Sequence, residues 1–168
     1  YMVLDFSTKR NLEITFSMQD GGREGSLISV LDKTETAMGG RLLKKWISAP
    51  LKKLDLILKR QESVDELYGN KSLRKNLFSE IREIGDLERL ISKVCTGRAN
   101  PREIIAIKFS LKKIPAIKNY LLNVECRTLK QVSEGLSSLD KLVEKIEKAV
   151  IDSPPLSIGD GGIIKNGF

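Results

Sequence analysis

The sequence predicts an all-α fold, a helical bundle with at most a short strand near its N-terminus. Aromatic residues make up 5% of the 168 residues while Leu, Ile, Lys and Glu are abundant, a mixture that favours helices over sheets. Apolar residues recur at three- and four-residue intervals, and residues that begin or end helices bound these segments. A hydrophobic content of 40% suits one core, so we expect a single domain over residues 1–168.

The first thirty residues are expected to be the least regular part of the chain. Residues 1–4 could form a short strand or an extended lead-in, and Ser7 or Thr8 could cap a short helix through Ile14. A polar loop with three glycines follows at residues 20–25.

The next helix is expected to begin at Thr34 or Thr36 and to end at Pro50. Its apolar face carries Leu42, Leu43, Trp46 and Ile47. The tryptophan on this face indicates a core anchor rather than a platform for stacking bases. Gly39 and Gly40 are costly inside a helix, which predicts that another segment approaches their backbone closely.

Residues 55–84 keep helical spacing throughout and form either one long helix or two. Gly69 and Asn70 could end one helix and begin the next. The apolar register continues across them, which favours one continuous helix, with a bend possible at this point.

Helix boundaries are clearest in the middle of the chain. Asp86 can cap a helix that Gly97 ends. Asn100, Pro101 and Glu103 then supply a cap, a favoured first helical residue and the acid of a capping box.

The last third contains one interruption and one further helix. Pro115 predicts a kink or restart, and residues 123–137 read as a polar linker. Ser138 can cap a final amphipathic helix, which Pro154 and Pro155 terminate before a turn-rich tail.

Residue types argue against catalysis. Histidine is absent, which removes the commonest general base and the commonest metal ligand. Cys95 and Cys126 form no CxxC pair, and we expect them to be reduced, half-buried thiols.

Other candidate motifs have simpler explanations. Gly159, Gly161 and Gly162 lack the Lys-Ser or Lys-Thr of a phosphate-binding loop and indicate a tight turn. Acidic pairs such as Asp86 with Glu88, or Asp140 with Glu144, are explained by pairing within helices. We therefore expect no catalytic, cofactor-binding or metal-binding residue in this chain.

The formal charge of +7 comes from 29 basic and 22 acidic residues. The densest basic stretch is 41–60, which predicts a possible DNA-facing patch. This patch consists of Arg41, Lys44, Lys45, Lys52 and Lys53. The alternative, which we favour from sequence, is that these side chains solvate exposed helix faces.

No apolar run approaches the roughly 20 residues that span a bilayer, and no signal-peptide pattern is present. We expect a cytoplasmic protein without membrane association. The sequence starts without Met and stops after a glycine-rich turn, which suggests a piece of a longer chain.

Four phrases, in order, resemble the MutS mismatch-repair family. They are LDFSTKRNLEI (4–14), SLISVLDKTETAMGGRLLKKWISAPL (26–51), IGDLERLISKVCTGRANPRE (84–103) and DSPPLSIGDGGIIKNGF (152–168). Ala37 stands where the family usually has proline, which removes a preset first-turn angle without requiring a different fold.

The resemblance implies the first part of the family's core, or lever, domain, ending just before the inserted clamp. It implies a structural connector between the clamp that holds mismatched double-stranded DNA and the ATP-binding domain. ATP and Mg would then be cofactors of the parent protein alone, and the parent would form a homodimer and interact with MutL. The mismatch-binding, clamp and ATPase domains are not represented, so this chain itself is expected not to be an enzyme.

Two alternatives remain open from the sequence. One is a free-standing basic helical module that binds nucleic acid through residues 41–60. The other is a protein-interaction adaptor that uses an exposed apolar stripe. Because the resemblance implies that a later segment completes the core, we also expect residual apolar exposure and weak self-association.

Overall fold

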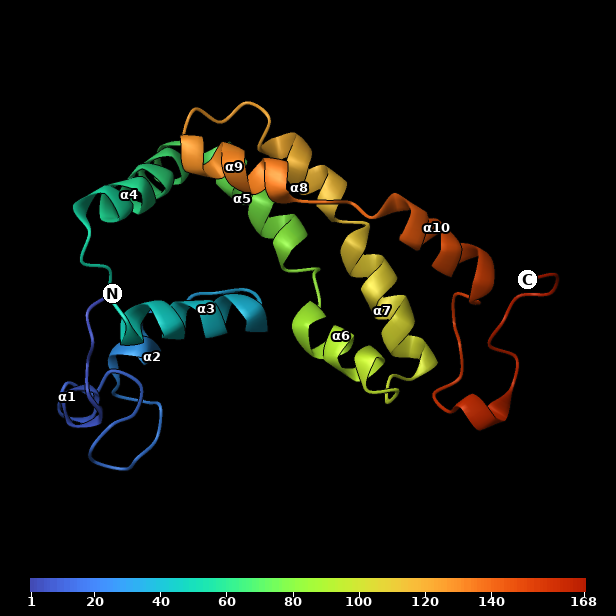
Figure 1. Ribbon diagram of the computed structural model, residues 1–168, viewed down its shortest axis with the longest axis horizontal. Helices are drawn as coiled ribbons and strands as arrows, with labels where there is room; N and C mark the ends of the chain where they lie inside the picture. The colour runs from blue at the N-terminus through green and yellow to red at the C-terminus, as the bar shows by residue number, and fades with distance from the viewer. The chain divides into compact units, whose positions relative to one another are not determined.

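A computed structural model describes the backbone of residues 1–168 and every side chain except that of Ile158. The described chain is helical, and its only β-structure is an isolated antiparallel bridge between Val150 and Ile164 (Figure 1). The predicted all-α fold is confirmed. Contacts divide the chain into two compact units, Tyr1–Asp65 and Glu66–Phe168. This division does not test whether residues 1–168 form a single domain, which stays a prediction.

The first unit contains three helices and most of a fourth. They are α1 (Phe6–Asn11), α2 (Leu27–Leu31), α3 (Ala37–Ser48) and the first part of α4 (Leu54–Gly69). Ile14 and Ile28 are buried in this unit, and the amide of Ile28 donates to the carbonyl of Ile14 at 3.0 Å.

The start of the chain differs from the prediction in two ways. Residues 1–4 are extended but form no strand, and the amide of Met2 donates to the carbonyl of Pro50 at 2.7 Å. Asp5, rather than Ser7 or Thr8, caps α1 by accepting a hydrogen bond from the Thr8 amide at 2.6 Å. The helix ends before Ile14 because Glu13 adopts the left-handed conformation, with φ of 46°.

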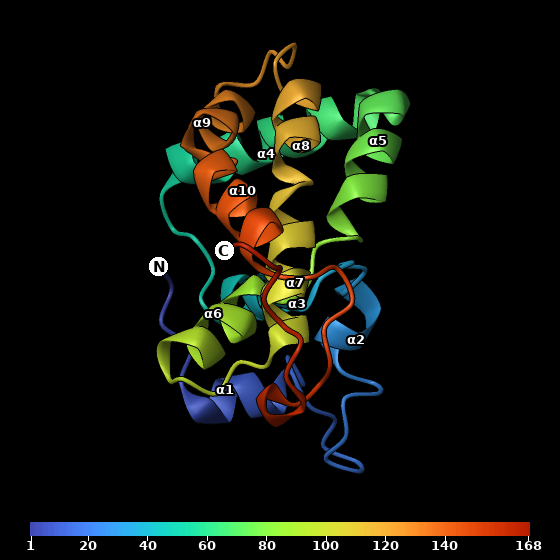
Figure 2. The same cartoon turned by 90° about the vertical axis from the view of Figure 1, so that its right-hand side faces the viewer.

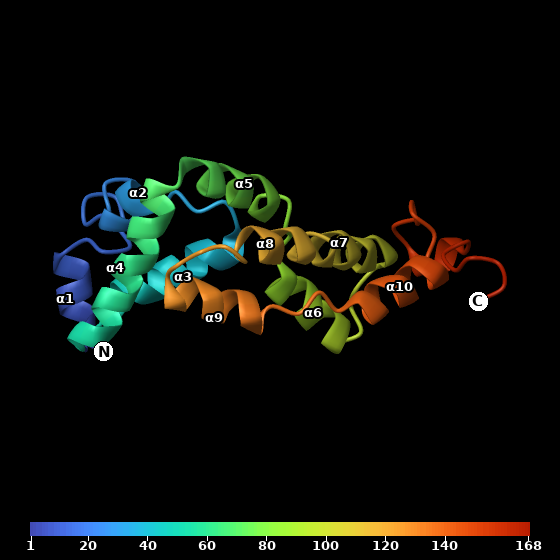
Figure 3. The same cartoon turned by 90° about the horizontal axis from the view of Figure 1, so that it is seen from above.

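The second unit holds the remaining helices. They are α5 (Lys71–Ile81), α6 (Leu87–Cys95), α7 (Pro101–Leu111), α8 (Ile114–Tyr120), α9 (Arg127–Gly135) and α10 (Asp140–Ala149), followed by a 3₁₀ turn, η1 (Ile158–Asp160). Helices α7 and α8 follow one another nearly in line, with α9 and α10 along one side (Figure 3). Helix α5 packs on α8, and both α6 and α10 pack on α7 (Figure 2).

The preference for one continuous helix over residues 55–84 was wrong. The helix breaks at Asn70, whose side chain accepts a hydrogen bond from the Leu73 amide at 2.9 Å and so begins α5. A local cap outweighs the continuing apolar register because it satisfies an amide that the start of a helix leaves without a partner.

The predicted boundaries in the middle of the chain are confirmed. Asp86 caps α6, and Gly97, with φ of 68°, follows its C-terminus. Asn100 and Glu103 form both hydrogen bonds of the capping box at the start of α7, and Pro101 is its first residue. The interruption before Pro115 is also confirmed, since α7 and α8 are separate helices.

Two predictions in the last third were wrong. The expected linker 123–137 contains α9, and a distant carboxylate holds the two residues just before this helix. The carboxylate of Glu66 accepts hydrogen bonds from the amides of Glu125 and Cys126, both at 2.6 Å. Ser138 does not cap α10, because its hydroxyl donates to the Asp140 carboxylate at 2.6 Å and Leu139 occupies the cap position with φ of 51°.

Three clusters of buried apolar side chains hold the second unit together. The first joins α5, α8 and the loop after α8 through Leu73, Leu77, Ile117, Leu121 and Val124. The second joins α7 to α10 through Ile105, Ile146, Ala149 and Val150. The third joins α7 to α10 through Ile107, Leu111 and Val143, with Leu87 and Leu90 of α6 packed against it.

Several apolar faces lie outside these clusters. Helices α3, α4 and α6 contain no buried residue among those described. Trp46 is 39% exposed, so the prediction of a core anchor was wrong. Cys95 is exposed rather than half-buried, whereas Cys126 is half-buried as expected. The expected residual apolar exposure is therefore present in both units.

Candidate functional site

The five basic residues predicted to face DNA all belong to the first unit, and all five are exposed. Arg41, Lys44 and Lys45 lie three and four residues apart on α3, which places them on one side of this helix. Lys52 and Lys53 lie beyond its end, in the extended connection to α4. No finding tests DNA binding by these residues, so the patch stays a prediction.

Local contacts fix the start of α3. The Thr36 hydroxyl accepts a hydrogen bond from the Gly39 amide at 3.1 Å. A Cβ added at Gly39 would lie 3.3 Å from the Cβ of Thr34, and one at Gly40 would lie 3.3 Å from the Thr34 hydroxyl oxygen. The predicted close approach to these two glycines therefore comes from the segment just before the helix.

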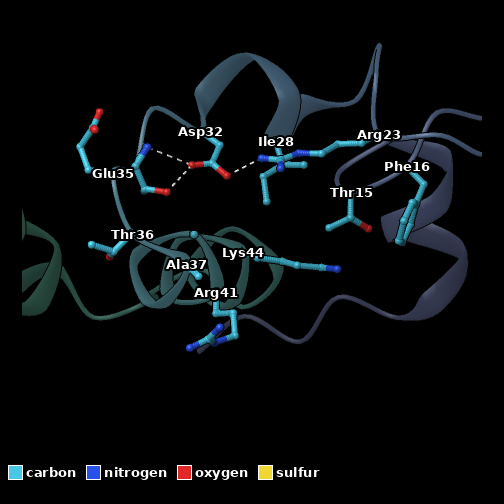
Figure 4. A pocket seen from close by; sticks show the side chains of 12 residues that line it. Thr15, Phe16, Arg23, Ile28, Asp32, Glu35, Thr36, Ala37, Arg41 and Lys44 are labelled. Atoms are coloured by element: carbon cyan, nitrogen blue, oxygen red, sulfur yellow. Dashed lines mark hydrogen bonds and ion pairs between the residues drawn. The ribbon is translucent and has the colours of Figure 1, made fainter. Parts of the chain in front are cut away.

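A pocket of 510 Å³ opens beside α3 within the first unit (Figure 4). Arg41 and Lys44 line it from α3, and Phe16, Arg23 and Asp32 line it from the preceding segments. Lys45, Lys52 and Lys53 are not among its lining residues.

Asp32 organises the wall of this pocket. Its carboxylate accepts hydrogen bonds from the hydroxyl and amide of Thr34, at 2.6 and 3.0 Å, and pairs with the Arg23 guanidinium. The hydrogen bonds from Thr34, and then the contact with Arg23, lower the pKa of Asp32 to about 2. Part of the positive charge of the pocket is thus already neutralised from within.

Two aromatic rings of the first unit form cation–π contacts with basic side chains. The ammonium of Lys44 lies 5.1 Å from the centre of the Phe16 ring, toward which its side chain extends in Figure 4. The guanidinium of Arg60 lies 3.6 Å from the centre of the Trp46 ring. These contacts hold basic side chains against the surface and leave their charge available to an anion. The roles of Phe16, Arg23 and Asp32 could not be predicted from the sequence, because they depend on contacts between segments that show no motif.

Among the described residues, no group of three His, Cys, Asp or Glu side chains could hold a metal ion. The glycine-rich segment begins with the 3₁₀ turn η1 (Ile158–Asp160) and continues with Gly161 and Gly162, whose φ values are 66° and 63°, which confirms the tight turn. Asp86 caps α6 by accepting a hydrogen bond from the Arg89 amide, and the expected pairing of the acidic residues within their helices stays a prediction. Within the described part of the chain, no helix combines the length and apolar character that crossing a bilayer requires.

Comparison with known proteins gives one consistent family. Residues 7–166 match the sequence model described as MutS domain III. The whole chain is 46% identical to the DNA mismatch repair protein MutS of Symbiobacterium thermophilum, and it covers 19% of that protein. The corresponding proteins of Salinibacter ruber and Pelotomaculum thermopropionicum are 42% and 46% identical, with 18% and 20% of their length covered. The chain thus spans about a fifth of these relatives, and it belongs to the MutS domain III family.

Proposed function

We propose that this chain is a structural connector of a MutS-like mismatch-repair protein. It would couple the clamp that holds mismatched DNA to the part that binds ATP. The observation that carries the proposal is the match of residues 7–166 to MutS domain III. The relatives are named as DNA mismatch repair proteins, and each is about five times longer than this chain.

The second unit has a construction that suits a connector. Helices α7 and α8 span residues 101–120, and at a rise of about 1.5 Å per residue they extend about 30 Å nearly in line (Figure 3). Helix α5 braces α8, and helices α6 and α10 brace α7. Helices packed in this way can transmit a displacement from one end of the pair α7 and α8 to the other, because packed helices adopt discrete arrangements rather than deforming continuously.

Long-range polar contacts stiffen the same unit. The Glu66 carboxylate, near the end of α4, accepts hydrogen bonds from the two amides just before α9 and so ties these two segments together. The Gly85 amide donates to the Ser110 hydroxyl at 3.0 Å, which ties the start of the α6 region to α7. Both contacts join elements that are distant in sequence, as a rigid connector requires.

Partners and cofactors belong to the parent protein under this proposal. Mismatched double-stranded DNA, a second copy of the parent and MutL would be its partners, and ATP with Mg would bind outside this chain. The parent would act in the cytoplasm as a DNA-dependent ATPase, while this chain would have no activity of its own.

An exchange experiment tests the proposal. The matching segment of the Symbiobacterium thermophilum protein is replaced by this chain, and the chimera is expressed in bacteria that lack their own MutS. We expect the chimera to lower the mutation rate, because the two segments are 46% identical along their whole length. The control is the same chimera with Leu77→Pro, which breaks α5 at a buried residue. A folded chimera that leaves the mutation rate as high as this control would contradict the proposal.

The basic patch on α3 favours a second candidate, a module that binds nucleic acid by itself. If this were the main function, the isolated chain would bind DNA tightly, with an affinity that falls steeply as salt rises. Under the connector proposal, binding is weak and indifferent to mismatches. The sharpest comparison is Lys44→Glu/Lys45→Glu on α3 against Lys145→Glu/Lys148→Glu on α10, because all four lysines are exposed. Loss of tight binding in the α3 variant alone would support the second candidate.

A further inference from the structure

Residues 150–165 form a strap that leaves the end of α10 and returns to it. The amide of Ile151 donates to the carbonyl of Ile163 at 3.0 Å, and the amide of Lys165 donates to the carbonyl of Ala149 at 2.8 Å. The bridge between Val150 and Ile164 lies between these two hydrogen bonds. The strap is therefore closed at its base by backbone pairing.

Two polar contacts fasten the first part of the strap to α7. The Lys108 ammonium donates to the Asp152 carboxylate at 3.0 Å, and the Arg102 guanidinium donates through its Nε to the carbonyl of Pro154 at 3.0 Å. Most of the residues from 156 to 162 whose side chains are described are exposed. Apolar packing of the described side chains is confined to the two ends of the strap, where Pro154 is buried and Ile163 lies against the cluster of α7 and α10. The side-chain contacts of Lys108 and Arg102 add the polar fastening.

The two partners of the ion pair differ sharply in environment. The Lys108 side chain is 3% exposed, whereas that of Asp152 is 74% exposed. A buried ammonium is costly unless an opposite charge lies beside it. The ammonium also lies 4.8 Å from the centre of the Phe109 ring, which carries no charge. Lys108 therefore needs the strap, although most of the strap is in solvent.

The remaining charges near the pair cannot simply replace Asp152. Glu147 on α10 is close enough to feel the charge of Lys108, but its Oε1 already accepts a hydrogen bond from Lys112 at 2.5 Å. Lys165, on the returning part of the strap, donates to the carbonyl of Glu147 at 2.8 Å. If Asp152 left, Lys108 would have to share the single negative charge of Glu147 with Lys112, so the buried ammonium would be less well neutralised.

We propose that the strap is a releasable latch, which the ion pair between Lys108 and Asp152 holds on α7. Closed, it neutralises the buried lysine and keeps α7 against α10. Open, it leaves that lysine without its carboxylate and loosens the two helices. This inference uses contacts within this chain only and does not depend on the proposed connector role.

The test measures amide hydrogen exchange in the 168-residue chain by NMR. Asp152→Asn removes the charge of the latch with little change in shape. Asp160→Asn is the matched control, because it removes the same charge from an exposed position of the same strap. The amides of Ile151 and Lys165 report the strap, and the amide of Leu121, in a separate core cluster, reports overall opening.

We expect Asp152→Asn to speed exchange at Ile151 and Lys165 about tenfold, while exchange at Leu121 changes less than twofold. Asp160→Asn should leave all three amides within twofold of the original chain. An increase below threefold at the strap, or an equal increase at Leu121, would overturn the proposal.

A second variant keeps the proposal testable if Asp152→Asn fails to fold. Lys108→Met/Asp152→Asn removes the buried charge together with its partner. Helices α7 and α10 should then pack as in the original chain, and the thermal midpoint should be higher than that of Asp152→Asn alone. The strap should nevertheless exchange about tenfold faster than in the original chain, because its fastening is gone. Exchange at the original rate in this double variant would show that the ion pair does not hold the strap.

Discussion

Replacing Leu121 by alanine should destabilise the second unit strongly, whereas the same change at its neighbour should not. Leu121 is 4% exposed and belongs to the cluster that joins α5 to α8, while Leu122 is 66% exposed. The two leucines are adjacent in the sequence, and the structure distinguishes them by burial. Their comparison holds the residue type and the local chain constant.

The expected magnitude follows from burial. Replacing a buried leucine by alanine costs about 2 to 5 kcal/mol, from lost transfer free energy and from the cavity that remains. We expect about 3 kcal/mol for Leu121→Ala, because four other buried side chains surround it and cannot all move into the space. Leu122→Ala should change the free energy of unfolding by less than about 0.5 kcal/mol, as is usual for exposed positions.

Urea unfolding followed by far-UV circular dichroism measures both changes. With a denaturant dependence of about 1 to 3 kcal/mol per M, a loss of 3 kcal/mol lowers the urea midpoint by about 1 to 3 M. The Leu122→Ala midpoint should remain within about 0.5 M of the original. Equal midpoints for the two variants would refute the assignment of this core.

Three further predictions concern turns, caps and pH. Gly97→Ala should destabilise the chain by about 1 kcal/mol or more, because φ is 68° at this position. Gly69→Ala, with nothing within 4 Å of the added Cβ, should be neutral or stabilising. The check is the urea midpoint, which should fall for Gly97→Ala and should not fall for Gly69→Ala. Asn100→Ala should cost about 1 kcal/mol by removing one side of the capping box, and an unchanged thermal midpoint would contradict this. Because folding lowers the pKa of Asp32 from 3.8 to about 2, its ionised carboxylate stabilises the fold. This stabilisation is fully present above pH 3.8 and is lost as the pH falls through about 2. Asp32→Asn should therefore lower the urea midpoint at pH 7, and the difference from the original chain should shrink between pH 4 and pH 2.

The sequence predicted best where local chemistry decides the structure. Asp86, Asn100 and Pro101 each satisfy or remove amides of their own helix, so their roles follow from neighbours three residues away. The restart before Pro115 is predictable for the same reason.

Long-range contacts explain the errors. Helix α9 begins without a side-chain cap, and the residues just before it are held by the carboxylate of Glu66, about sixty residues earlier. The break at Asn70 shows the reverse case, in which a local cap wins over a continuous apolar stripe. Trp46 was misassigned because an apolar face predicts burial only if another element covers it.

The candidate site was predictable only as a cluster of charges. The stretch from 41 to 60 identified the basic side chains of α3 and the connection after it. The pairing of Arg23 with Asp32 and the burial of Lys108 have no sequence signature, since each depends on a partner from another segment.

The most direct test of the connector role measures ATP-driven release from mismatched DNA in the chimeric protein. Val64→Pro breaks α4 at an exposed position, so it interrupts the helix without opening a core. Val3→Pro makes the same replacement at an exposed residue outside any helix and is the control. The connector role predicts that Val64→Pro still binds mismatched DNA and hydrolyses ATP but no longer releases the DNA when ATP is added. Normal ATP-driven release by Val64→Pro, equal to that of Val3→Pro, would contradict it.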